Sequence, residues 1–137
     1  MMWLRVPYTA AAFVLCSLLV SAPASATLDT AVGQRSIVPD KPMSDCSTKA
    51  NHALTTVMQS ATEAGQGSGH WFGFDNVGGA PSEIAIVECH PQGTGYAVSF
   101  TCSVQVPPST DTAAALCTKL SAAFDASPAT ATGGAAW

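Results

Sequence analysis

The chain contains little charge, and very little positive charge. Asp, Glu, Lys and Arg together make up 10% of its 137 residues, with nine acidic residues against five basic ones. Nucleic acids and anionic membrane surfaces are bound by clustered Lys and Arg side chains, and this sequence has no such cluster. We therefore predict that neither is a partner of the protein.

The sequence also lacks the short motifs that mark common catalytic and cofactor sites. It has no C-x-x-C redox pair, no H-x-x-x-H zinc pair and no G-x-S-x-G nucleophile elbow. The glycine-rich run Gly65–Gly69 lacks the lysine of a phosphate-binding loop. It also follows a predicted helix and leads into a predicted strand, the reverse of the order in a dinucleotide site. We predict no cofactor and no metal site.

Long apolar runs are confined to the start of the chain. Ala10–Val20 is an apolar run of eleven residues, which is too short to span a bilayer. Arg5 precedes the run and the small residues Ala-Ser-Ala at 24–26 follow it, which is the pattern of a secretory signal peptide. We predict that residues 1–26 are removed on export to a periplasm or to the extracellular medium. The mature chain then has no membrane segment and a net charge of −5.

Four cysteines remain after the predicted cleavage, namely Cys46, Cys89, Cys102 and Cys117. An even number of cysteines in an exported chain of this size predicts two disulfides. We favour Cys46–Cys89 together with Cys102–Cys117, because each bond then joins a predicted helix to a predicted strand. Cys46–Cys102 with Cys89–Cys117 is the alternative, since the sequence does not fix the connectivity.

The clearest element is a strand over Tyr96–Val106. Its residues alternate over eleven positions between an apolar set and a set of Ala, Ser, Thr and Gln. This period of two is typical of a strand with one buried and one wetter face. Pro107 and Pro108 end the strand, because neither residue can donate a backbone hydrogen bond.

The remaining elements complete an α+β domain. Helical spacing of apolar residues predicts helices over about 45–63 and from the Ser109 or Thr110 cap to about Asp125. Aromatic and β-branched residues predict strands over 70–75 and 82–90. We expect one domain over 43–126, in the order (β)αβββα. Its antiparallel sheet has three or four strands, and two helices pack on one face. Residues 27–42 form an arm or an edge strand, and 127–137 a disordered tail.

A hairpin joins the strand over 82–90 to the strand over 96–106, and its register decides which residues are buried. A two-residue turn at Gly93-Thr94 places Val87 and Cys89 beside Phe100 and Val98. A three-residue turn places Ile86 and Glu88 there instead. We favour the first register, because it keeps Glu88 out of the core.

Two groups of side chains are candidates for a functional site. A metal site can be drawn from His70, Asp75, Glu88 and His90, but His70 and Asp75 face opposite sides of a regular strand. Among the aromatic residues, Phe72, Phe74 and Phe100 are expected in the core. Trp71 and Asp75 share the other face of their strand and are a candidate contact surface.

These observations favour a non-catalytic exported protein with a binding, inhibitory or accessory role. Its partner would be a protein or a small molecule of unknown identity. The alternative is a small exported metal-dependent or hydrolytic enzyme that uses His70, Asp75 or His90.

Overall fold

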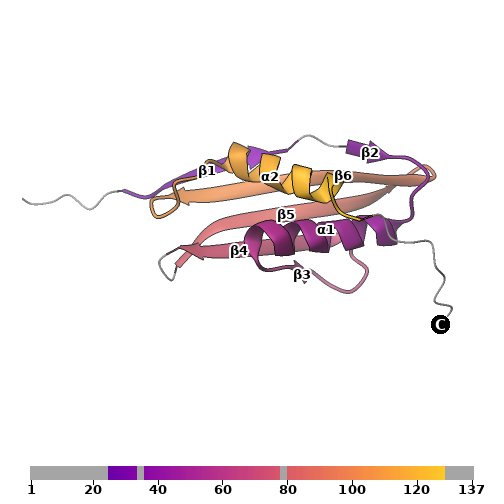
Figure 1. Ribbon diagram of the computed structural model, residues 1–137, viewed down its shortest axis with the longest axis horizontal. Helices are drawn as coiled ribbons and strands as arrows, with labels where there is room; N and C mark the ends of the chain where they lie inside the picture. The colour runs from indigo at the N-terminus through magenta and orange to yellow at the C-terminus, as the bar shows by residue number, and fades with distance from the viewer. Residues whose placement is uncertain (1–24, 34–35, 78–79, 129–137) are drawn as a thin grey trace, which may run out of the picture.

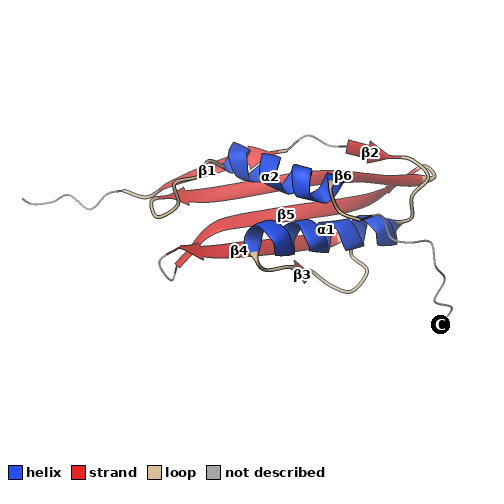
Figure 2. Cartoon of the chain, viewed as in Figure 1, coloured by secondary structure: helices blue, strands red, loops and turns tan. Residues whose placement is uncertain are grey.

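A six-stranded antiparallel sheet and two helices make up the part of the chain that the computed structural model describes, residues 25–33, 36–77 and 80–128 (Figure 1). The elements in chain order are β1 (Thr27–Val32), β2 (Ser36–Val38), α1 (Met43–Met58), β3 (Thr62–Glu63), β4 (His70–Val77), β5 (Ala80–Gln92), β6 (Gly95–Val106) and α2 (Ala113–Asp125). The strand order is β1-β6-β5-β4-β3, and β2 also pairs with β6. Both helices lie on the same face of the sheet (Figure 2). The α+β class and the two helices on one face are confirmed.

The sheet is larger than the predicted three or four strands. The N-terminal arm contributes β1 and β2, which pair with two successive parts of β6. The two-residue strand β3 pairs with β4. These edge strands are short and mostly exposed, so they lack the apolar alternation that reveals a half-buried strand in a sequence.

The predicted core strand is confirmed as β6. Tyr96, Val98, Phe100, Cys102 and Val104 are all buried, with exposed fractions of 2% or less. The two-residue hairpin is also confirmed, because Val87 pairs with Phe100 and Cys89 with Val98.

The helices begin and end at residues other than those predicted. α1 stops at Met58 rather than near residue 63, because Gln59 adopts the left-handed conformation that commonly ends a helix. The N-cap of α1 is Pro42, whose side chain makes no capping bond. Thr112, not Ser109 or Thr110, caps α2 by accepting a hydrogen bond from the Ala115 N–H.

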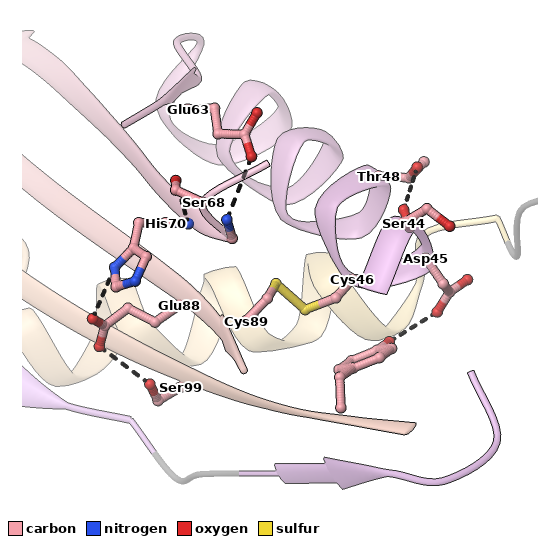
Figure 3. The surroundings of a disulfide bond; sticks show 12 residues. Ser44, Asp45, Cys46, Thr48, Glu63, Ser68, His70, Glu88, Cys89 and Ser99 are labelled. Atoms are coloured by element: carbon pink, nitrogen blue, oxygen red, sulfur yellow. Dashed lines mark hydrogen bonds and ion pairs between the residues drawn. A yellow bond between two sulfur atoms is a disulfide. The ribbon is translucent and has the colours of Figure 1, made fainter. Parts of the chain in front are cut away.

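Two disulfides fasten one helix each to the sheet, with the connectivity that we favoured. Cys46 of α1 is bonded to Cys89 of β5, and Cys102 of β6 to Cys117 of α2 (Figure 3 shows the first bond). They close loops of 43 and 15 residues. Cross-links of this kind restrict the unfolded chain, which matters in a domain whose core is small.

The predicted orientation of β4 is wrong. We expected Phe72 and Phe74 in the core, but Phe74 is 44% exposed and Phe72 is only partly buried. Gly73 is buried instead, and a Cβ added to it would lie 3.1 Å from Leu54 Cδ2 of α1. The helix packs directly on the backbone of β4 at this glycine, so the face that carries Trp71, Gly73 and Asp75 is the covered one.

Candidate functional site

The sheet face that carries no helix is the main candidate for a functional surface. Residues paired across antiparallel strands share a face, so the register identifies its members. We call this surface the open face. It consists of Leu28, Thr30, Val32, Ile37, His70, Phe72, Phe74, Ile84, Ile86, Glu88, His90, Ala97, Ser99, Thr101, Ser103 and Gln105.

The open face carries several large apolar side chains that are exposed to solvent. The large hydrophobic residues that are exposed in the described part of the chain all lie on it: Leu28, Val32, Ile37, Phe74, Ile84 and Ile86. Their exposed fractions run from 37% for Ile86 to 75% for Val32. Single exposed apolar residues are ordinary in soluble proteins, but a group of them on one face marks an interaction surface.

The apolar side chains form two columns with a polar column between them. Phe72 pairs with Ile86 and Phe74 with Ile84 across β4 and β5. Leu28 and Val32 form the other column on β1. The open-face residues of β6 between these columns include Ser99, Thr101 and Ser103, which are partly buried. Hollows of about 350 and 370 Å³ lie over the first column.

A polar cluster lies at one end of the open face, toward the β5–β6 hairpin. The His70 Nδ1 atom lies 3.3 Å from Glu88 Oε1, and the Ser99 hydroxyl donates to Glu88 Oε2 at 3.4 Å (Figure 3). The His70 and His90 rings meet edge to face with their centroids 5.7 Å apart. The side chains of His70 and Glu88 are 45% and 34% exposed, so water reaches both.

The candidate metal site of His70, Asp75, Glu88 and His90 is only partly assembled, because Asp75 lies apart from the other three residues. Asp75 pairs with Glu83 on the helix-covered side of the sheet, whereas His70 and His90 are on the open face. The Asp75 carboxylate accepts a hydrogen bond from the neighbouring Asn76 N–H at 2.7 Å. Within the described ranges, no three His, Cys, Asp or Glu residues are arranged to hold a metal ion.

The candidate contact surface at Trp71 and Asp75 is on the face that α1 covers. Trp71 is partly buried and packs against the core, and its indole Nε1–H is buried without a hydrogen-bond partner. Gly73 is the sequence signal that could have identified the exposed aromatic residues. A glycine lets α1 approach the side of β4 that carries Trp71 and Gly73, so the neighbouring aromatic residues on the other side are left exposed. Phe72 and Phe74 are therefore the aromatic residues that a partner would meet.

Tyr96 and Asp45 are buried titratable residues that hold two elements together. Tyr96 is fully buried, and its hydroxyl donates to Asp45 Oδ2 at 2.8 Å, where Asp45 is 2% exposed. Burial, followed by the hydrogen bond and the charge of Asp45, raises the pKa of Tyr96 well above its usual value. The pair joins the first turn of α1 to β6 beside the Cys46–Cys89 bond. It fixes the helix on the sheet.

A third hollow lies on the helix side, between β1 and α2. Its volume is about 500 Å³, and small residues of both elements line it together with Asp125. Its lining has no cluster of titratable groups, since Asp125 is the one ionisable side chain there.

Neither helix of the described residues has the length and apolar character needed to cross a membrane. Most of the predicted signal peptide, residues 1–24, lies outside the described part of the chain, as do residues 129–137 of the predicted tail. Two disulfides are typical of proteins that leave the reducing cytosol.

No protein-family model matches the chain, and no curated protein matches its sequence. The function is therefore inferred from the arrangement of its own residues.

Proposed function

We propose that the protein is an exported, non-catalytic domain that acts by binding, and that the open face is its binding surface. One observation carries this proposal. The exposed large hydrophobic residues of the described chain are gathered on the open face, while the two helices cover the other side of the sheet. A face of this kind lowers its free energy when a partner removes it from water.

Export is part of the proposal because the domain depends on oxidised cysteines. The four cysteines of the predicted mature chain are all in disulfides, and such bonds persist outside the cytosol. N-terminal sequencing of the secreted protein tests this step. We expect Thr27, the first residue of β1, at the new terminus. A protein that stays in the cytosol with residues 1–26 attached would contradict export.

Binding through the open face can be tested with a charge placed in its apolar column. We expect Phe74→Asp to abolish association in cross-linking of the exported protein in its native medium. Thr55→Asp is the matched control, because Thr55 is exposed on α1 on the opposite side of the molecule. Equal association by the two variants would show that the open face is not the binding surface.

The enzymatic alternative has less support, because Asp75 lies across the sheet from His70 and His90. Metal analysis of the purified protein tests it directly. Stoichiometric zinc or copper that is lost in His70→Ala would favour the enzyme over the binding protein.

A further inference from the structure

We infer that the partner of the open face is a second copy of this chain, so that the protein is a homodimer with its two sheets stacked face to face. This inference rests on the proposed function and names the occupant of the binding surface. Size, charge and the arrangement of the apolar columns support it.

The area of the open face matches the requirement of a stable dimer. Four strands, β1, β6, β5 and β4, contain 6, 12, 13 and 8 residues. With strands about 4.8 Å apart and a rise of about 3.3 Å per residue, they span a flat area on the order of 600 Å². Two such faces in contact bury on the order of 1,200 Å² of flat area. This value reaches the range of specific interfaces even before the additional surface of protruding side chains is counted.

The charge of the open face suits a copy of itself better than a charged partner. The residues that make up the open face include one carboxylate, that of Glu88, and no Lys or Arg. Glu88 lies toward the hairpin end, where His70 and Ser99 of the same copy hold it. Two copies can therefore stack without burying a carboxylate that lacks polar partners, whereas an acidic or basic partner would lose the hydration of its charges against an apolar surface.

The order of the columns allows a two-fold arrangement in which the four strands of each copy lie over those of the other. A two-fold axis that runs parallel to the strands, midway between β5 and β6, places β1 of each copy over β4 of the other. Val32 and Phe72 then lie at the same level, because the register aligns both with Ile86 and Thr101. Val32 of each copy thus lies over Phe72 of the other, and Thr30 lies level with Phe74. The stacked sheets form an isologous interface.

The molecular mass in solution tests the inference. We expect the purified, oxidised protein to sediment with twice the mass of the chain, and Phe74→Asp to weaken the dimer about tenfold or more. Val32→Thr together with Ile86→Thr is a second test, because both replacements keep a β-branched side chain that favours a strand. Thr118→Asp, on the exposed side of α2, should leave the dimer unchanged. A monomer at concentrations up to about 1 mM would overturn the inference, as would a dimer that the open-face variants do not weaken.

A cross-link locates the interface within the dimer. Thr101→Cys introduces a thiol close to the proposed axis, and Thr118→Cys introduces one on the far side of each copy. We expect a short bis-maleimide to join Thr101→Cys chains efficiently and Thr118→Cys chains poorly. The reverse result would place the dimer interface on the helices and refute the inference.

The two proposals fail in different ways. A monomeric protein that still associates with another molecule through the open face refutes the homodimer and leaves the binding role intact. A monomeric protein whose association is the same in Phe74→Asp and Thr55→Asp refutes both.

Discussion

The buried hydrogen bond between Tyr96 and Asp45 gives the sharpest prediction about stability. Tyr96→Phe removes only the hydroxyl, which donates to Asp45 Oδ2 at 2.8 Å in a site where both residues are at most 2% exposed. The ring remains, so little packing is lost. A buried hydrogen bond to a carboxylate contributes about 2 kcal/mol, within a range of roughly 1.5–3 kcal/mol. We expect Tyr96→Phe to lower the free energy of unfolding by this amount at neutral pH.

The pH dependence of this effect has a definite sign. The pKa of Tyr96 is raised in the folded protein, chiefly by burial, whereas in the unfolded chain it is about 10. The contribution of Tyr96 is therefore fully present below pH 10 and is lost progressively as the pH rises above that value. The stability of the wild-type protein should fall more steeply above pH 10 than that of Tyr96→Phe.

Urea unfolding at several pH values measures both effects. With a urea m-value of about 1–3 kcal/mol/M, a loss of about 2 kcal/mol lowers the midpoint by roughly 1 M. Tyr96 is the only tyrosine in residues 27–137, so tyrosinate absorbance of the mature chain reports this residue alone. A native titration near pH 10, or an unchanged urea midpoint in Tyr96→Phe, would refute the reasoning. Asp45→Asn is the matched control, and we expect it to destabilise less because an amide oxygen still accepts the bond.

Three further predictions follow from the packing. Replacing both Cys102 and Cys117 by Ala should lower the free energy of unfolding by about 3 kcal/mol, because this disulfide closes a loop of 15 residues. Replacing both Cys46 and Cys89 by Ala should lower it by about 4 kcal/mol, because their loop contains 43 residues. The opposite order in urea unfolding would show that loop closure is not the main source of the stabilisation. Gly73→Ala should destabilise by about 2 kcal/mol in the same assay, because its Cβ would lie 2.6 Å from the Ser60 carbonyl oxygen; a loss no larger than that of Ser99→Ala would contradict this packing. Ser60→Ala should cost about 1 kcal/mol and speed amide exchange at Phe74, whose N–H donates to the Ser60 hydroxyl at 2.9 Å; unchanged exchange would show that this bond does not protect the strand.

The sequence allowed the centre of the fold to be predicted, because burial there leaves a regular pattern. β6 alternates over its length, and the choice of hairpin register follows from keeping Glu88 out of the core. The disulfide pairing follows from the same register, since Cys89 and Cys102 then both face the helices. Each of these inferences depends on residues that are stable in only one environment, such as Glu88 near water and the half-cystines beside the helices.

The edges of the sheet and the functional face were not predictable in the same way. β1 and β2 are exposed on most of their side chains, so their sequence carries no periodic burial signal. In β4, Phe72 and Phe74 resemble core residues by type, and Gly73 resembles a residue of the exposed face. The structure reverses these roles, because the close approach of α1 requires the absence of a side chain more than it requires an apolar one. The aromatic part of the open face was missed for this reason.

Ser60 has a consequence for self-association that goes beyond the stability of one loop. Its hydroxyl accepts from the Phe74 N–H and donates to the Phe74 carbonyl at 2.8 Å, and β3 pairs with the two residues of β4 opposite to it. The outer side of β4 is thus occupied at Trp71, Phe72 and Phe74 by the chain itself. A sheet with two open edges can add strands at both ends and grow into a fibril, whereas one with a single open edge ends after one addition. Pairing through β1 would therefore yield a closed pair of molecules rather than a growing fibril, because the Ser60 hydroxyl already occupies the backbone groups of Phe74 at the other edge.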